Sequence, residues 1–241
     1  VLICIMQYSI IIPIRNEQQG IIKTLEDLTS EIKNYNYEIL LINDFSTDET
    51  SETIKKNLFK FKSIRLLNNK IKGLGRAISF GIQESKGEYV CIMMSDLSDD
   101  INDLKKYFEL IALNDVDAIF GSRFTKESKV KNYPKNKLIL NRIANLFVKY
   151  IFFNNYNDFT NAFKIYRRNS LLKTLPLVSE SFNIFLEIPL KFITRKMKYR
   201  IIPINWNGRI SGKSKFEIKE LRSKYLFTLF YCLLEKVLLK K

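Results

Sequence analysis

Histidine is absent from this sequence of 241 residues. It is the most frequent general base in enzymes and a common ligand of transition metals, so its absence excludes Ser-His-Asp sites, Cys-His sites and zinc hydrolases. Cysteine is scarce as well, with only Cys4, Cys91 and Cys232. An odd number of widely spaced cysteines argues against a disulfide framework and against a zinc site. We therefore expect a reducing, cytoplasmic setting.

Long apolar stretches are missing too. No segment reaches the roughly 20 apolar residues that a helix needs to cross a bilayer. The apolar N-terminal residues lack a basic leader and continue directly into the first expected strand, so we do not interpret them as a signal peptide. Neither internal repeats nor low-complexity linkers are evident. With 46% hydrophobic and 27% charged residues, the composition is typical of one globular domain with an extension.

Acidic residues are few in the second half of the chain. Residues 1–120 contain 14 Lys and Arg against 18 Asp and Glu, whereas residues 121–241 contain 26 against 7. The net charge of +15 therefore resides in the second half, where it would attract phosphates, anionic lipid headgroups or nucleic acid. No helix-turn-helix, zinc-binding or RNA-binding signature accompanies this charge, so we expect no nucleic-acid partner.

Four apolar stretches end in polar side chains. They are residues 9–14 followed by Arg15, Asn16 and Glu17; residues 38–42 followed by Asn43 and Asp44; residues 89–95 followed by Asp96, Ser98, Asp99 and Asp100; and residues 118–120 followed by Gly121, Ser122 and Arg123. Each stretch reads as a strand that places polar groups at its carboxyl end. In a parallel sheet all strands point the same way, so these groups would meet at one edge and form a ligand site.

Helical patterns separate the expected strands. Apolar residues recur at helix spacing in residues 21–32, 54–58, 74–82 and 101–111, and a further short strand is expected at 64–67. Ser46 to Glu49 predicts a capping box that opens the second helix. This alternation predicts an α/β protein with a Rossmann-like, mostly parallel sheet covered by helices on both faces.

Two segments of the second half predict strongly apolar helices. Residues 138–153 are apolar around most of the helix, apart from a stripe of Asn141, Asn145 and Lys149, and residues 225–234 carry no charge. Such helices must bury most of their faces. We expect them to pack in the protein core or against a second copy of the chain in a homo-oligomer, or to lie on a membrane surface; these alternatives stay open here.

Several motifs resemble those of inverting glycosyltransferases with the GT-A fold, in the large family that includes dolichol-phosphate mannosyltransferase and bacterial polyprenyl-phosphate glycosyltransferases. Their order along nearly the whole chain is similar to that of the family. The motifs are residues 9–17, 43–50, 72–77, 94–98, 121–123, 157–164, Glu187 and 209–215. The resemblance implies one continuous GT-A domain, with a nucleotide-sugar-binding half at 1–123 and an acceptor-binding half at 124–241 that ends in amphipathic helices.

The residues themselves are suited to a sugar nucleotide, which carries a base, a ribose and a pyrophosphate. Glu17 and Asp44 can accept hydrogen bonds from ribose hydroxyls or base N–H groups. Arg76 can face the nucleotide, while Gly73 and Gly75 allow a close backbone approach. The resemblance adds neighbours from the same motifs. The residues expected to bind the nucleotide sugar are Pro13, Arg15, Glu17, Asn43, Asp44, Lys72, Gly73, Arg76, Ser95 and Asp96.

A divalent cation is expected at Asp96, which would hold Mg²⁺ or Mn²⁺ against the pyrophosphate with Ser98 nearby. Met94 stands where the family usually has its first Asp, and a thioether is a poor ligand for a hard cation. Either Asp96, phosphate oxygens and water suffice for the metal, or cationic side chains carry more of the leaving-group charge. A degenerate, non-catalytic homologue that binds sugar nucleotides is a third alternative.

For the acceptor, the resemblance implies a lipid monophosphate such as undecaprenyl or dolichyl phosphate. Its oxygen would attack the anomeric carbon with inversion and expel a nucleoside diphosphate. An ionised phosphate is already a nucleophile, so the missing histidine is no obstacle. Arg123 and Lys137 match positions that face the acceptor phosphate. Asp158 matches an acidic position near the reaction centre, where it would orient the acceptor or act as a base.

The remaining expected site residues lie after a strand at 201–206. They would close over the leaving pyrophosphate and are Arg209, Lys213 and Lys215. With its lipid acceptor, the protein would lie at the cytoplasmic face of a membrane as a peripheral protein. The second candidate function is a GT-A transferase that acts on a saccharide or protein hydroxyl. That reaction needs a general base, which would make Asp158 indispensable.

Overall fold

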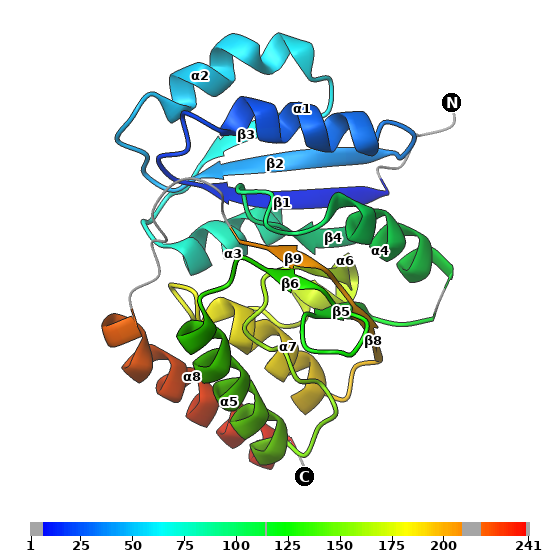
Figure 1. Cartoon of the computed structure of the whole chain (residues 1–241), viewed down its shortest axis with the longest axis vertical. Helices are drawn as coiled ribbons and strands as arrows, with labels where there is room; N and C mark the ends of the chain where they lie inside the picture. The colour runs from blue at the N-terminus through cyan, green and yellow to red at the C-terminus, as the bar shows by residue number, and fades with distance from the viewer. Residues whose placement is uncertain (1–6, 114, 209–217, 240–241) are drawn as a thin grey trace.

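The computed structural model describes residues 7–113, 115–208 and 218–239. Within these residues, a seven-stranded sheet forms the centre of the molecule in the order β3-β2-β1-β4-β7-β5-β8 (Figure 1). Its strands are β1 (Tyr8–Ile14), β2 (Tyr37–Asn43), β3 (Ile64–Asn68), β4 (Tyr89–Ile92), β5 (Ala118–Ser122), β7 (Lys164–Arg167) and β8 (Tyr199–Pro203). All except β7 run in the same direction. The mostly parallel α/β sheet that the sequence predicts is confirmed.

Strand β7 corrects the expectation that every strand points the same way. It lies between β4 and β5 and is antiparallel to both, with Cys91 opposite Ile165 on one side and Ile119 opposite Ile165 on the other. Because β7 runs in reverse, its beginning lies at the edge where the other strands end. Lys164 and the loop before it are thereby brought to the predicted site.

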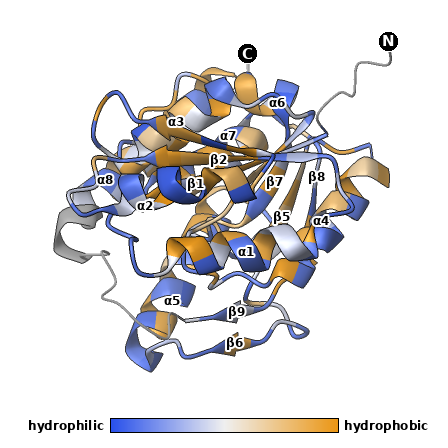
Figure 2. Ribbon diagram, turned by 90° about the horizontal axis from the view of Figure 1, so that it is seen from above, coloured by the Kyte–Doolittle hydropathy of each residue, from blue (hydrophilic) through white to orange (hydrophobic). Residues whose placement is uncertain are grey.

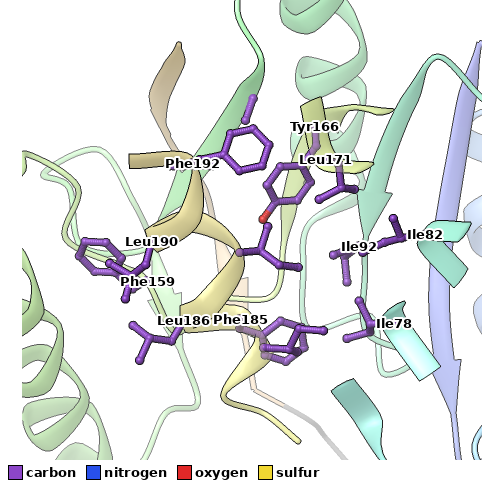
Figure 3. Packing of buried hydrophobic residues seen from close by; sticks show 14 of the residues in the cluster. Ile78, Ile82, Ile92, Phe159, Tyr166, Leu171, Phe185, Leu186, Leu190 and Phe192 are labelled. Carbon is purple, nitrogen blue, oxygen red and sulfur yellow. The ribbon is translucent and has the colours of Figure 1, made fainter. Parts of the chain in front are cut away.

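Helices cover both faces of the sheet because its strands alternate their apolar side chains. Ile10 and Ile12 of β1 pack with α1 (Ile21–Glu31) and α4 (Ile101–Leu113). Ile11, between them, packs with α3 (Leu74–Glu84) and shares a cluster with α7 (Ile184–Thr194). Figure 3 shows Phe185 of α7 directed toward Ile78 of α3 and Phe192 beside Tyr166 of β7, while Leu186 and Leu190 lie on the other side of the helix, near Phe159. The two-residue period of a strand thus supplies both cores.

The second helix starts later than its sequence predicts. Helix α2 spans Thr50–Asn57 and is followed by a short 3₁₀ helix, η1 (Leu58–Lys60). Glu49 is its N-cap residue and makes no capping hydrogen bond. Asp48 Oδ1 instead accepts the Thr50 N–H at 3.1 Å. The predicted capping box is therefore wrong, because Ser46 and Thr47 bind the loop after β1 rather than the start of α2.

The second half adds a lobe below the sheet edge (Figures 1 and 2). Its elements are β6 (Val130–Lys131), which pairs with β9 (Trp206–Asn207), and the helices α5 (Lys135–Ile151) and α8 (Ile218–Leu238). Helix α6 (Arg168–Leu172) instead follows the end of β7 and lies at the opposite edge of the sheet (Figure 2). The strand expected at 201–206 is divided between β8 and β9. Among the described residues, no helix is both long enough and apolar enough to cross a membrane.

Helix α5 is oriented opposite to the usual pattern, in which apolar residues face inward. Of its residues, Asn145 and Val148 are buried. Asn145 Nδ2 donates to Asn141 Oδ1 (2.7 Å) and to Thr160 Oγ1 (3.1 Å). The apolar residues exposed on α5 are Ile139, Leu140, Ile143, Leu146, Phe147 and Tyr150. Packing of α5 in the core, one of the expected arrangements, is therefore wrong: the amide stripe faces inward.

Candidate active site at the carboxyl edge of the sheet

Two neighbouring strands begin the site. Strands β1 and β2 are parallel, with Ile14 opposite Asn43, so the residues after them lie at one edge. Asn16 adopts a left-handed conformation (φ 52°), and its Oδ1 accepts the Thr47 N–H at 2.8 Å. The Glu17 N–H donates to Thr50 Oγ1 at 2.9 Å. These contacts join the two loops and hold the half-buried side chains of Arg15 and Glu17 at the edge.

Asp44 is the buried anchor of the next loop. It is 4% exposed, and its Oδ1 accepts the Gly73 N–H at 2.8 Å and the Asn69 Nδ2 at 2.9 Å. Asn43, at the end of β2, donates to Ser51 Oγ and Asn68 Oδ1 at 3.0 Å each. The first carboxylate of the predicted nucleotide site therefore also fixes the turn at Gly73, beside which Lys72 is exposed.

The two glycines bring the turn at residues 73–75 into close contact with another part of this chain. A Cβ at Gly75 would overlap the Ser179 carbonyl, and one at Gly73 would lie 2.6 Å from the Glu180 carbonyl oxygen. Residues 179–180 of this chain thus occupy the space in which a side chain at either glycine would lie. The expected role of Gly73 in nucleotide binding remains a prediction. Arg76 forms an ion pair with Glu180. A groove of about 460 Å³ lies between α3 and residues 177–180, and Arg76 is among its lining residues.

The loop after β4 carries Asp96. β4 is parallel to β1 and next to it in the sheet, so this loop lies at the same edge as Asp44. Asp96 Oδ1 accepts the Ser98 N–H at 3.1 Å, and the Ser95 carbonyl accepts Thr24 Oγ1 at 3.0 Å. Met94 packs against the apolar core. Its position agrees with the poor ligand character of a thioether.

Asp99 is a charged group of the site to which we assigned no function from sequence. Its side chain is buried, and burial together with the nearby Asp96 charge raises the pKa of the Asp99 carboxyl to about 7. Arg123 and Lys164 act in the opposite direction on this pKa, so both cations lie close to Asp99. A run of acidic residues after a strand is the signal by which Asp99 can be found, but its burial cannot be seen in the sequence.

Arg123 and Asp158 form a buried ion pair. The Arg123 Nε and backbone N–H donate to Asp158 Oδ2 at 2.8 Å each, and its Nη2 donates to Oδ1 at 2.7 Å. Asp158 is completely buried and Arg123 is 6% exposed. Both oxygens of the carboxylate are thus occupied by one arginine. The structure brings these two predicted catalytic residues together, with Asp158 in the position to orient Arg123.

Lys164 completes the charged cluster, and we assigned it no role from its motif. Its Nζ donates to the carbonyls of Phe159 (3.2 Å) and Asn161. Burial lowers the pKa of Lys164 to about 7, a shift opposed by the negative charge of Asp158. The ammonium therefore holds the loop that carries Asp158. The sequence offers little signal for this role, because a lysine is ordinarily exposed.

Cations and aromatic rings line the side of the site toward α5. Arg123 lies over the Phe124 ring (5.3 Å) and near the Trp206 ring (6.0 Å), and Arg142 of α5 lies over Phe124 at 5.2 Å. Lys137 is exposed on the first turn of α5. Arg142 is a further candidate for binding an anionic ligand. We did not single it out from the sequence, because it lies in a mostly apolar helix. The predicted residues Arg209, Lys213 and Lys215 lie outside the described residues.

The described part of the chain offers a cation few ligands. No group of three or more Asp, Glu or Cys residues converges in residues 7–113, 115–208 and 218–239. Asp96 and the Ser98 hydroxyl are the expected oxygen donors of the β4 loop, and the Asp99 carboxyl lies in the same loop. Mg²⁺ is often bound by one or two carboxylates together with substrate phosphates, and one carboxylate fits that arrangement. A cation would therefore need the phosphates of a bound nucleotide.

Comparisons with known proteins agree with this geometry. The chain is 28% identical over 223 residues to a dolichol-phosphate mannosyltransferase of Pyrococcus furiosus, covering 90% of this chain and 61% of that protein. It is 27% identical to a dolichyl-phosphate beta-glucosyltransferase of Trichomonas vaginalis, covering 87% of this chain and 66% of that protein. The chain thus spans less than two thirds of the length of either relative.

Solved structures share the fold. Glucosyl-3-phosphoglycerate synthase from Mycobacterium tuberculosis, in complex with Mn²⁺, uridine diphosphate and phosphoglyceric acid, has a TM-score of 0.70 at 14% identity, over 96% of this chain and 78% of that one. This likeness shows the fold alone, and the expected GT-A architecture is confirmed. The family model described as "Glycosyl transferase family 2" matches residues 9–175. The chain belongs to glycosyl transferase family 2.

Proposed function

We propose that this protein transfers a sugar from a nucleoside diphosphate sugar to a polyprenyl phosphate, with inversion at the anomeric carbon. The single observation that carries the proposal is the gathering of Asp44, Asp96 and the Arg123–Asp158 pair at one edge of the sheet. The family match and the activities named for the two curated relatives support it. A sugar donor needs carboxylates for its hydroxyls, and a phosphate acceptor needs cations; this edge offers both.

The donor is assigned to the β1, β2 and β4 loops. Glu17 and Asp44 would accept hydrogen bonds from the nucleoside, with Lys72 and Arg76 nearby. Asp96 and Ser98 are the residues that would hold Mg²⁺ or Mn²⁺, jointly with the donor pyrophosphate. When bound, the cation would neutralise negative charge that develops on the departing nucleoside diphosphate. Solved structures of the same fold that contain Mn²⁺ together with uridine diphosphate or uridine-diphosphate-glucose support this assignment.

The acceptor phosphate is assigned to Arg123, Lys137 and Arg142, the cations on the side of the site toward α5. An oxygen of the lipid phosphate would form the bond to the anomeric carbon as the bond from that carbon to the nucleotide phosphate breaks. The electron pair of the broken bond leaves with the nucleoside diphosphate. Arg123, Arg142 and Lys137 would hold the acceptor phosphate, and Asp158 would keep Arg123 in place. No proton has to be removed, because the attacking phosphate is ionised.

A hydroxyl acceptor is less well supported. It requires a base beside the acceptor oxygen, and Asp158 was the expected base. The carboxylate of Asp158 is completely buried and accepts three hydrogen bonds from Arg123. Both oxygens of this carboxylate are bound by Arg123, so neither is positioned to take a proton from an acceptor hydroxyl. We therefore favour the lipid phosphate.

A membrane surface is the partner that we propose for the exposed apolar residues of α5 and α8. The apolar residues exposed on α8 include Leu226, Phe227, Phe230, Leu234 and Val237. The Lys236 Nζ on α8 donates to the Phe152 carbonyl that ends α5 (2.7 Å), which ties the two helices together. Many exposed apolar side chains on two joined helices favour an interaction site, and a lipid acceptor must be reached at a bilayer.

The proposal is tested in two steps. Thermal unfolding with GDP, UDP or dTDP, with and without Mn²⁺, identifies the nucleotide that raises the melting temperature. The matching sugar nucleotide is then offered with polyprenyl phosphate in detergent or with soluble saccharides. We expect transfer to the lipid phosphate. Asp96→Asn is expected to lower this transfer by about a hundredfold or more with the melting temperature retained, because one electrostatic contact to the leaving group is lost.

Asp115→Asn is the matched control, since Asp115 is an exposed acid that pairs with Lys198 away from the site. It should leave transfer unchanged. Transfer to saccharides but not to the lipid phosphate would favour the hydroxyl acceptor. Nucleotide binding without transfer to any acceptor would identify a non-catalytic homologue, the alternative raised by Met94.

A further inference from the structure

A buried ion pair on α7 takes no direct part in the reaction proposed above. Glu187 and Lys191 lie one helical turn apart, with Oε1 and Nζ separated by 3.3 Å, and their side chains are 0% and 1% exposed. Two charges are costly to bury, even as a pair, unless further hydrogen bonds satisfy them. Such a pair calls for an account of what it holds in place.

Both charged groups bind the main chain of residues 174–179, ahead of α7. The Glu187 carboxylate accepts the N–H groups of Val178 (2.9 Å) and Ser179 (2.8 Å). The Lys191 ammonium donates to the carbonyls of Thr174 (2.9 Å) and Pro176 (2.6 Å). Together with the ion pair, these contacts use all three donors of the ammonium. The pair therefore fixes the path of this segment rather than that of a side chain.

The end of the same segment, residues 179–180, contacts the turn formed by Gly73 and Gly75. The Gly75 N–H donates to the Glu180 carbonyl at 3.0 Å. Gly73 and Gly75 approach residues 179–180 so closely that a Cβ at either position would overlap their carbonyl oxygens. Gly73 has φ 142°, a conformation that other residues rarely adopt. Because packed backbones transmit displacement, a shift of residues 178–180 would move this turn.

The glycine turn is in turn bound to the donor carboxylate. The Gly73 N–H donates to Asp44 Oδ1, and Asn69 Nδ2 bridges that oxygen and the carbonyl of Ile71 (2.7 Å). Hydrogen bonds thus link Glu187 to residues 178–180, these residues to the glycine turn, and the turn to Asp44. Glu187 touches none of the residues assigned to the donor, so its effect would be indirect.

We propose that Glu187 is a positioning residue for the donor nucleotide, acting through the main chain of residues 178–180 on the turn at Gly73 and Gly75. The inference rests on the proposed function, because that function assigns to the donor Asp44, which this turn binds through the Gly73 N–H. Replacement of Glu187 would loosen the turn and weaken nucleotide binding, while the acceptor cations on the other side of the site keep their partners.

The experiment compares Glu187→Gln with Glu38→Gln. Glu38 is a matched control, because it is also buried, pairs with Arg65 and accepts a backbone N–H from Lys86 (2.7 Å), yet it lies at the start of β2. We expect Glu187→Gln to raise the Kd of the stabilising nucleoside diphosphate by about three- to thirtyfold and to leave the KM for polyprenyl phosphate within about twofold. Glu38→Gln should leave that Kd unchanged.

Two further readouts separate positioning from general stability. The double variant Glu187→Gln with Lys191→Met removes the unpaired ammonium, so it should recover the melting temperature but not the Kd. Hydrogen exchange of the nucleotide-free protein should speed up at the Gly75 amide in Glu187→Gln and not in Glu38→Gln. Unchanged exchange at Gly75, or equal effects of both glutamine variants on the Kd, would overturn the inference while leaving the proposed function intact. A wild type that binds no nucleoside diphosphate would overturn both.

Discussion

Arg123 and Asp158 are 35 positions apart in the chain, yet they form the most completely satisfied ion pair at the edge of the sheet. The pair is buried, so its two charges depend on each other far more than an exposed pair would. The charges of this pair act on the pKa values of Asp99 and Lys164, and burial moves the pKa of each to about 7, upward for Asp99 and downward for Lys164. At the scale of single residues, the site is a compact set of charges whose protonation depends on its neighbours.

Arg123→Ala is expected to lower the free energy of unfolding of the protein, whatever its effect on the choice of acceptor. It leaves the Asp158 carboxylate buried without its partner, and breaking a buried pair in this way costs about 3–5 kcal/mol. Urea unfolding followed by circular dichroism measures the loss. The paired variant Arg123→Met with Asp158→Leu should regain most of the stability and still transfer no sugar to lipid phosphate. An unchanged urea midpoint in Arg123→Ala would contradict the buried pair.

Lys164 makes stability depend on pH. Its pKa is about 7 in the folded protein and 10.5 ordinarily, so between these values the unfolded chain binds a proton that the folded chain does not. The stability contribution is therefore complete above the ordinary pKa and is lost as pH falls toward 7. We expect the free energy of unfolding of the wild type, relative to Lys164→Met, to rise between about pH 7 and about pH 9, by at most about 1.4 kcal/mol per pH unit.

Urea unfolding of both proteins across that range is the measurement. The subtraction removes groups that titrate alike in the two proteins, such as exposed lysines. A difference that stays flat with pH would mean that the Lys164 ammonium keeps its ordinary pKa.

At the scale of elements, α5 shows how the polar face of a helix can be the buried one. Asn141 and Asn145 use their amides on Thr160 and on each other, so the stripe is hydrogen-bonded and can face the protein. Most of the apolar residues of the helix are exposed instead, and Val148 is the buried exception. α8 is partly different: Thr228, Leu229 and Cys232 are buried, and its outer side adds to the exposed apolar surface.

Ile143→Gln combined with Phe147→Gln should weaken binding to vesicles of phosphatidylcholine and phosphatidylglycerol by about tenfold or more. Burial of each large apolar side chain in the bilayer interface contributes on the order of 1.5–3 kcal/mol, and both are lost. Sedimentation with the vesicles measures the bound fraction. The melting temperature should stay the same, because both residues are already exposed.

Phe59→Gln is the control, since Phe59 is also apolar and 83% exposed but lies in η1, in the first half of the chain. It should leave vesicle binding unchanged. A wild type that is dimeric and does not sediment with vesicles, while the double glutamine variant is monomeric, would show instead that a second copy of the chain covers α5.

At the scale of the whole molecule, one sheet joins both halves of the sequence. β7 and β8 come from the positively charged half and lie beside β4 and β5 (Figure 1). Carboxylates of the first half and cations of the second thereby meet at the same edge. The boundary expected between residues 123 and 124 remains a prediction. Strands from both sides of it belong to one sheet.

Much of this arrangement follows from local sequence. The apolar runs ending at Ile14, Ile42 and Ile92 predict β1, β2 and β4, because a strand buried on both faces reads as a continuous apolar run. β7 was not expected, since Lys164–Arg167 is short and carries a charge at each end. The predicted capping box does not form, because Ser46 and Thr47 are hydrogen-bonded to the loop after β1.

The sequence by itself determined the order of most strands and helices and the edge at which the polar groups gather, because residue periodicity and the place of polar residues after an apolar run are local properties. Only the tertiary structure decided that β7 runs in reverse, that Arg123 pairs with Asp158, that Lys164 is buried and that α5 turns its amides inward. Each of these depends on contacts between residues distant in the chain, and the free energy of burying a charge or an amide is set by the partners it meets there.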